Sequence, residues 1–329
     1  MISYSFERTS TKGLYRVVDS RTKNWDWYFL GKLNRQKLPK TEEGVYLRAE
    51  SAITRNGWPM GKWFEGWLRE KSKEESERIF TEAMDRGSRV HRAIETLFEI
   101  MPKSGGYSGF NVSKARKSVL NRSTEVWDEK KAELVPLQEE DWRCILSFEH
   151  FWSLHKPFVF AVGSSLYSVA NGYAGTTDIT GWILTKECGI KQCPCKGVIG
   201  KVGLPDLKTT TAIRDTHGMQ VAAFAGAENV DQFLKGKKLE YTADLRLGTQ
   251  HVNTRGYEFV VYDREDTAKN FESFLLANEV DKRIRKEFEP EKEIREIPDS
   301  VQIQIRPVPK QKVPIAKKVA KKAKKKAKR

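Results

Sequence analysis

The sequence predicts a mixed α/β fold, between the α/β and α+β classes, because segments with helical and with strand periodicity alternate along the chain. A helical segment precedes strands that carry acidic residues, and a second helix, a further pair of strands and a closing helix follow. With 329 residues, 39% of them hydrophobic, the chain is long enough to bury a large core. A mixed sheet flanked by helices satisfies this order, since each helix can cover one face of the sheet.

Four segments have the residue pattern of helices. The longest runs from Glu74 to Ile100, and its residues Val90, Ile94, Leu97 and Phe98 fall at helical spacing and predict a buried stripe. The other predicted helices cover residues 113–134, 216–229 and 266–286. In the last two, the residues expected to face inward are Val221, Ala222, Phe224 and Ala225, and Phe271, Phe274, Leu275 and Leu276.

Short runs of β-branched and aromatic residues predict the strands. The final two runs are expected to form an antiparallel pair. The predicted strands are 14–18, 144–146, 158–162, 173–182, a stretch ending near Asp206, 241–247 and 258–262.

Positive charge is concentrated at the end of the chain. The net charge is +15, and residues 310–329 hold eleven lysines and arginines and no acidic residue. Like charges at this density prevent collapse into a core, which predicts a tail that is disordered when free. We therefore divide the chain into a folded domain over residues 1–286, a charged linker over 287–309 and a Lys-rich tail over 310–329.

The tail is expected to bind DNA without sequence preference, because lysines that neutralise phosphates release counterions. A tail that only solubilises or targets the protein is the alternative. Membrane binding is not expected, since the sequence shows neither an amphipathic basic helix nor a lipidation motif. The lysines on which the DNA-binding prediction depends are Lys317, Lys318, Lys321, Lys322, Lys324, Lys325 and Lys326.

The composition also bears on location. No apolar run approaches the ~18 residues that span a bilayer, and the first residues lack the pattern of a signal peptide. Four cysteines in a chain of this length do not indicate a disulfide framework. An intracellular protein is therefore expected, cytoplasmic in a bacterium or phage-infected host and nuclear in a eukaryote.

The segment around Asp206 has the pattern of a metal-dependent hydrolytic site. Asp206 ends a β-prone stretch and is followed two residues later by Lys208, while Asp178 lies upstream in Gly175-Thr176-Thr177-Asp178. Residues i and i+2 of a strand point to the same face, so Asp206 and Lys208 should project together. Carboxylates bind hard divalent cations, and a lysine can stabilise negative charge on a phosphate. This combination suits phosphodiester hydrolysis.

The same triplet pattern occurs twice elsewhere, at Asp128-Glu129-Lys130 and at Glu129-Lys130-Lys131. Both overlap in a polar stretch that predicts an exposed helix rather than a strand. The strand context therefore distinguishes Asp206-Leu207-Lys208 from the other two.

Four motifs stand in order along the chain: Gly87-x-x-x-His91, Gly175-x-x-Asp178, Asp206-x-Lys208 and Gln220-x-x-x-Phe224. This order resembles the RecB-like branch of the PD-(D/E)xK nuclease superfamily, particularly phage-type exonucleases and relatives of the mitochondrial genome maintenance exonuclease. The resemblance covers roughly residues 45–280. It implies a restriction-endonuclease-like fold and a DNA nuclease, expected to be an exonuclease, acting in recombination, repair or replication.

The resemblance also implies roles for individual residues. Asp178, Asp206 and the backbone carbonyl of Leu207 would bind Mg²⁺ or Mn²⁺, and Lys208 would be the catalytic lysine. His91 would lie over the metal. Two supporting residues are implied as well: Glu95, one helical turn after His91, and Gln220, which would support the site or contact the nucleic acid.

Two features depart from the family pattern. Phe224 replaces the tyrosine of the last motif, and residues 164–168 lack the glutamate that many relatives carry before the Gly-x-x-Asp strand. A nucleic-acid-binding protein that keeps the fold without the chemistry is therefore the alternative function. A third hypothesis makes the tail dominant, in a DNA-compacting or accessory factor.

Cys188, Cys193 and Cys195 lie between the two acid-bearing strands. Three thiols this close can form three corners of a tetrahedral zinc site, but neither a fourth cysteine nor a histidine is near them in the sequence. An ordinary hairpin with Gly and Pro turn residues is the favoured interpretation. Some CRISPR-associated relatives carry a four-cysteine iron–sulfur cluster with three cysteines near the C-terminus. That cluster is not expected here, since no cysteine follows Cys195.

Overall fold

A computed structural model provides the structure of the chain. It describes residues 4–19, 26–33, 44–59, 70–99, 125–128, 133–191, 193–249 and 255–285, all of which lie in one compact unit, Met1–Ile294. These residues form two mixed sheets, a small hairpin and five α-helices, so the predicted mixed α/β class is confirmed. The predicted linker and the Lys-rich tail fall outside the described residues.

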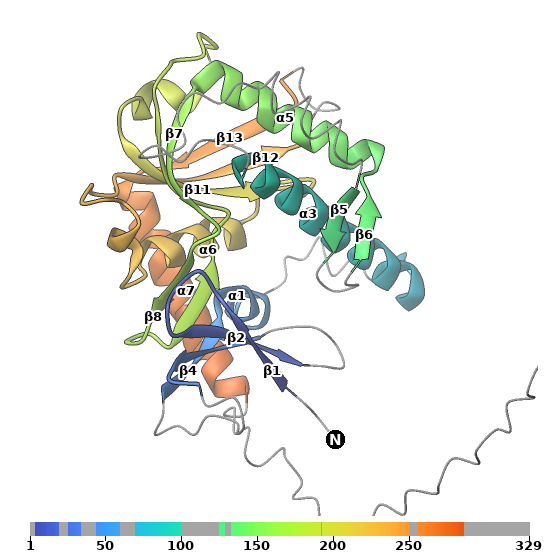
Figure 1. Cartoon of the computed structure of the whole chain (residues 1–329), viewed down its shortest axis with the longest axis vertical. Helices are drawn as coiled ribbons and strands as arrows, with labels where there is room; N and C mark the ends of the chain where they lie inside the picture. The colour runs from blue at the N-terminus through green and yellow to red at the C-terminus, as the bar shows by residue number, and fades with distance from the viewer. Residues whose placement is uncertain are drawn as a thin grey trace, which may run out of the picture. The chain divides into compact units, whose positions relative to one another are not determined.

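The central sheet has five strands in the order β13-β12-β11-β10-β7 (Figure 1). Three of its pairings are antiparallel, and β11 with β12 is the parallel one. A parallel pair requires a crossover connection, which the helix α6 supplies. The strands are β7 (Pro157–Val162), β10 (Ile179–Leu184), β11 (Val202–Lys208), β12 (Tyr241–Leu247) and β13 (Tyr257–Tyr262).

A second sheet has six strands in the order β1-β2-β3-β4-β9-β8. Its first four strands form an antiparallel meander, and β4 then pairs in parallel with β9. A separate hairpin joins β5 (Glu125–Asp128) to β6 (Glu133–Pro136). The strands of the second sheet are β1 (Tyr4–Arg8), β2 (Leu14–Asp19), β3 (Trp27–Gly31), β4 (Gly44–Ala49), β8 (Ser165–Ser168) and β9 (Tyr173–Thr176).

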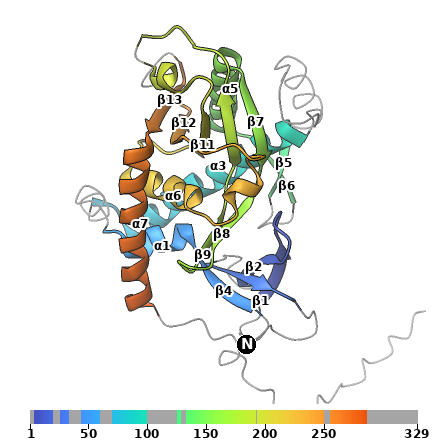
Figure 2. The same cartoon turned by 90° about the vertical axis from the view of Figure 1, so that its left-hand side faces the viewer.

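Helices cover both faces of the central sheet (Figures 1 and 2). On one face lie α3 (Lys73–Glu99) and α5 (Glu139–His155), and on the other lie α6 (Asp215–Ala225) and α7 (Arg264–Ile284). The short helix α1 (Glu50–Gly57) packs against α6 and α7. The arrangement is a three-layer sandwich around the central sheet.

The alternation of side chains along β11 decides where its polar residues lie. Val202 and Leu204 pack with Val221 and Phe224 of α6, whereas Leu207 belongs to the core beneath α3 and α5. Because side chains alternate with a period of two, Asp206 shares the α6 face with Val202 and Leu204. The acidic residue of the triplet therefore lies on the face that α6 covers.

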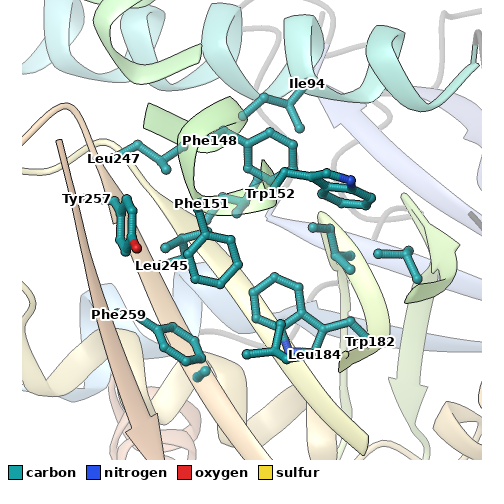
Figure 3. Packing of buried hydrophobic residues seen from close by; sticks show 14 of the residues in the cluster. Ile94, Phe148, Phe151, Trp152, Trp182, Leu184, Leu245, Leu247, Tyr257 and Phe259 are labelled. Atoms are coloured by element: carbon teal, nitrogen blue, oxygen red, sulfur yellow. The ribbon is translucent and has the colours of Figure 1, made fainter. Parts of the chain in front are cut away.

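Aromatic rings fill the core between α5 and the sheet (Figure 3). Phe151 stacks on Trp182 with ring centroids 5.3 Å apart and meets Tyr257 and Phe259 edge-on. The Trp182 indole donates a hydrogen bond to the Tyr241 hydroxyl at 2.9 Å, so its buried polar atom is satisfied. This core fixes α5 against the central sheet.

Several predicted elements are confirmed. Helix α3 matches the prediction for residues 74–100, and Val90, Ile94, Leu97 and Phe98 are all buried. Strands β12 and β13 pair antiparallel as expected. Helices α6 and α7 occupy the predicted segments within a few residues at each end.

Four predictions were wrong. The single strand predicted over residues 173–182 is divided into β9 and β10, which belong to different sheets, and Asp178 lies in the bend between them. Residues 144–146 belong to helix α5, because buried residues from Asp141 to His155 recur every three or four positions and Gln138 forms a capping box with Asp141. Residues 125–128, predicted as helix, form strand β5, so Asp128 ends a strand. Leu276 is exposed, since the buried face of α7 follows Phe274, Ala277, Asn278 and Asp281 instead.

Crossing a membrane would require a long and strongly apolar helix among the described residues. None of the helices in this part of the chain combines the required length with sufficient apolar character.

The buried and exposed leucines provide a test of the core. Leu245 on β12 is 0% exposed and Leu276 on α7 is 65% exposed. We expect Leu245→Ala to lower the free energy of unfolding by about 2–5 kcal/mol, because it removes buried methyl groups and leaves a cavity. The same substitution at Leu276 should change it by less than about 0.5 kcal/mol. Urea denaturation measures both, and equal effects would contradict this description of the core.

Candidate active site

Asp178 is held by groups from two other elements. It lies immediately before β10, with its Oδ1 2.9 Å from His91 Nδ1 of α3, and its Oδ2 accepts a hydrogen bond of 3.1 Å from the Leu207 amide of β11. Burial opposes ionisation of Asp178, but the charge and hydrogen bond of His91 and the Leu207 amide outweigh burial and lower its pKa. For His91, burial is outweighed by the charge of Asp178, which raises the pKa of the imidazole.

Asp206 and Lys208 project to the same side of β11 and form a buried ion pair through Asp206 Oδ2 and Lys208 Nζ. Burial raises the pKa of Asp206 to about 7, against the opposing charge of Lys208. Burial alone would lower the pKa of Lys208, but the charges of Asp206 and Asp244 raise it instead. Lys208 therefore stays protonated at neutral pH and acts as a fixed cation.

Gln220 connects this pair to an acidic residue that the sequence interpretation missed. Its Oε1 accepts a hydrogen bond of 2.7 Å from Lys208 Nζ, and its Nε2 donates one of 3.1 Å to Glu50 Oε1. Glu50, the first residue of α1, is 5% exposed, and burial raises its pKa to about 7. The side chain passes over Gly175 of β9, where a Cβ would collide with the carboxylate.

Glu50 bears on the missing glutamate at residues 164–168. The structure supplies a buried acidic residue to this region from far upstream in the chain. A sequence signal for it exists, because Glu50 directly follows the β-prone segment of β4, which contains Val45, Tyr46 and Leu47, at a strand-to-helix junction. The sequence interpretation looked for this glutamate only near Asp178 along the chain. Glu50 reaches the site from far upstream because β4, which precedes it, pairs with β9.

Asp244 is a second acidic residue that the sequence interpretation missed. It lies on β12 directly opposite Asp206 in the register and accepts a hydrogen bond of 2.8 Å from the Tyr262 hydroxyl. Burial raises its pKa, and the charge of Lys208 acts in the opposite direction. The available signal was a single acidic residue in the middle of a predicted strand.

Glu95 lies one turn after His91 on α3, as predicted, and pairs with Arg92 at 3.1 Å. Burial raises the pKa of Glu95 despite this pairing, and the charge of Asp178 adds to the effect. Because the charge of Asp178 acts on Glu95, Glu95 is electrostatically linked to the carboxylates of the candidate site.

Two arginines fix the segment that follows Lys208. Arg86 of α3 donates a hydrogen bond of 3.1 Å to the carbonyl of Thr209, and Arg246 of β12 donates one to the carbonyl of Thr211. The end of β11 is thereby tied to both neighbouring elements, which restricts where Lys208 can move.

The remaining motif residues lie elsewhere. Phe224 is buried among Val221 and Leu204 and belongs to the apolar core rather than to the polar network. Of the two competing triplets, Asp128 ends β5 and the residues 129–131 lie outside the described part of the chain.

The carboxylates of this region offer the oxygen ligands that hard divalent cations take, but they do not form a compact cluster. Within the described part of the chain, only His155, Cys188, Cys193 and Cys195 bring three or more ligand atoms within 4.8 Å of one another. Asp178, Asp206 and Glu50 offer carboxylate oxygens, which Mg²⁺ and Mn²⁺ prefer as ligands. Asp206 and Glu50 each have a pKa of about 7, so added positive charge is needed before both ionise fully at neutral pH. A bound cation would supply that charge.

A group of cysteine and histidine side chains that could hold a metal ion is formed by the end of α5 and the connection between β10 and β11. Cys188, Cys193 and Cys195 gather with His155, the last residue of α5, and one ligand atom from each lies within 4.8 Å of the others. The sequence offered no fourth ligand near the three cysteines, whereas the fold brings one from α5.

No protein-family model matches the chain, and no curated protein matches it either.

Proposed function

We propose that this chain is a metal-dependent deoxyribonuclease whose active site is formed by Asp178, Asp206 and Lys208. The observation that carries the proposal is a pair of polar chains from separate elements that meet on β11, one ending at the Leu207 amide and the other passing through Lys208. The first runs from His91 through Asp178 to the β11 backbone, and the second from Asp206 through Lys208 and Gln220 to Glu50. A purely structural ion pair would not require four further carboxyl groups with perturbed pKa values nearby, those of Glu50, Glu95, Asp178 and Asp244.

Asp178 and Asp206 would hold Mg²⁺ or Mn²⁺, with Glu50 joined to Asp206 through Lys208 and Gln220. When bound, such a cation would lower the pKa of a water molecule and offset the charge of the phosphodiester. Asp178 is ionised at neutral pH because its pKa is lowered, so it provides the permanent negative charge of the site. His91 and the Leu207 amide contact Asp178, and the motif resemblance assigns His91 and the Leu207 carbonyl to the metal.

Lys208 would stabilise the negative charge that develops on the phosphate during attack. It is protonated and is held by Asp206 and by Gln220, so its position is set before substrate binds. His91 and Gln220 are positioning residues, His91 for Asp178 and Gln220 for both Lys208 and Glu50. Glu95 would tune the charge at the margin of the site.

The finer parts of the proposal rest on the four motifs. Their order supports a restriction-endonuclease-like arrangement, action as an exonuclease, and a role in DNA recombination, repair or replication. The basic tail supports binding of the DNA partner, single- or double-stranded.

The proposed active site predicts metal-dependent cleavage of DNA. In Mg²⁺ or Mn²⁺, the protein should degrade end-labelled DNA, and EDTA should abolish the reaction. Asp206→Asn and Lys208→Ala should each lower the rate at least about 100-fold, because each removes charge from the reacting centre. Matched controls are Asp231→Asn in η2 (Val230–Gln232) and Lys201→Ala, an exposed lysine that precedes the same strand. DNA binding without metal-dependent products would instead support the alternative of a binding protein.

Another prediction concerns pH. The pKa of Glu50 is about 7 in the folded protein and about 4.3 in an unfolded chain. The folded state therefore binds this proton more tightly, and the stability it contributes is full below about pH 4 and is lost as the pH rises to about 7. The melting temperature of protein kept in EDTA should fall over this window, and Glu50→Gln should remove part of the fall. Identical pH profiles for the two proteins would show that Glu50 does not titrate there.

A further prediction concerns the tail. Removal of residues 310–329 should weaken DNA binding and flatten its salt dependence, by about 0.9 in the log–log slope for each phosphate of duplex DNA that the tail neutralises. Cleavage of short substrates at low salt should persist, because the proposed site lies within the described residues. Loss of all cleavage would contradict an independent catalytic domain.

A further inference from the structure

The connection between β10 and β11 brings three thiols together. Cys193 and Cys195 are buried and Cys188 is half-buried, with the sulfur atoms of Cys188 and Cys195 3.5 Å apart. The Cys193 amide donates to the Ile190 carbonyl at 3.0 Å, which folds the segment into a turn before η1 (Pro194–Val198). All three are free cysteines, so no disulfide holds the turn.

Backbone hydrogen bonds bring His155 to this turn. The amides of Thr185 and Lys186, at the start of the connection, donate to the carbonyl of His155 at 3.1 and 3.0 Å. Helix α5 ends there, because Lys156 adopts the left-handed conformation, with φ of 46°. The last side chain of the helix is thus fixed beside the cysteines.

The surroundings of His155 indicate that a partner for its ring is missing from the protein itself. The residue is 0% exposed, and its Nδ1 is buried without a hydrogen-bond partner. Its Nε2 lies 3.3 Å from the Tyr257 hydroxyl, and its ring packs 4.3 Å from that of Phe151 (Figure 3 shows Phe151 and Tyr257). Buried polar atoms are almost always satisfied, so an unpartnered nitrogen beside three thiols requires an explanation.

We propose that His155, Cys188, Cys193 and Cys195 bind one structural zinc ion. Three sulfur ligands and one imidazole within 4.8 Å of one another match the size and composition of a tetrahedral zinc site. The four protein ligands complete the coordination and leave no open position, which distinguishes a structural from a catalytic site. Mg²⁺ and Mn²⁺ prefer oxygen ligands, which the cluster lacks.

The zinc site would stabilise the hairpin that carries the carboxylates. Asp178 precedes β10 and Asp206 lies late in β11, so both lie toward one end of the hairpin, whereas the cysteines occupy the connection at the other end. Zinc would clamp this connection to α5 and to the aromatic core, since Cys193 and Cys195 belong to that core. Its loss should reduce stability without removing any group of the proposed active site.

Metal analysis of the untagged full chain tests the proposal. Protein expressed with added zinc should contain about one zinc per chain, and Cys193→Ser or His155→Gln should contain less than about 0.2, since each removes a ligand. Cys144→Ser is the matched control, because Cys144 is buried in α5 but lies outside the cluster. It should retain the wild-type zinc content.

If the variants fail to fold, the zinc site can be tested on the wild-type protein instead, by removing the metal or replacing it. A strong zinc chelator should lower the melting temperature and expose the three clustered thiols to a thiol reagent, and added zinc should reverse both effects. Cobalt in place of zinc should give the intense visible bands of a tetrahedral thiolate site. Absence of zinc from reduced protein, a disulfide among the three cysteines, or the brown absorption of an iron–sulfur cluster would each overturn the proposal.

Discussion

The buried ion pair of Asp206 and Lys208 is the constraint around which the candidate site is organised. Transfer of two charges from water to a protein interior costs on the order of several kcal/mol for each ion unless other groups compensate. Three neighbouring groups compensate for this cost. Gln220 accepts a hydrogen bond from Lys208, Asp244 adds negative charge from the adjacent strand, and Glu50 accepts a hydrogen bond from the Gln220 amide. A strand in the middle of the sheet would carry such a pair only with this support.

Residues of the candidate site are positioned by both sheets. The central sheet supplies Asp206, Lys208 and Asp244 from adjacent strands. In the second sheet, β4 leads into α1, and the pairing of β4 with β9 positions Glu50 at the start of that helix. Helix α3 adds His91 from outside the sheets. The carboxylates therefore depend on contacts between segments that are distant in sequence, and Gln220 joins two of these segments directly.

The periodicity of the sequence predicted the features that are set by residues close together in the chain. The shared face of Asp206 and Lys208, the buried stripe of α3 and the pairing of β12 with β13 all follow from spacing alone. Glu50 and His155 were not predicted, because tertiary contacts rather than sequence spacing bring them to their partners. The strand prediction for residues 144–146 was wrong because it rested on three β-prone residues, whereas the buried positions over the whole of α5 recur with helical spacing.

The meander that precedes β4 has a consequence for how this chain can be shortened. β4 lies between β3 and β9, so both of its edges are occupied by hydrogen-bonded neighbours. A fragment that began at β4 would retain Glu50 and all four motifs, yet it would leave one long edge of that strand open. Unpaired strand edges recruit strands from other molecules. The first three strands thus move the open edge of the sheet from β4, which leads directly into Glu50, to the five-residue strand β1. In the full chain, pairing with another molecule at this edge would take place away from the strand that positions Glu50.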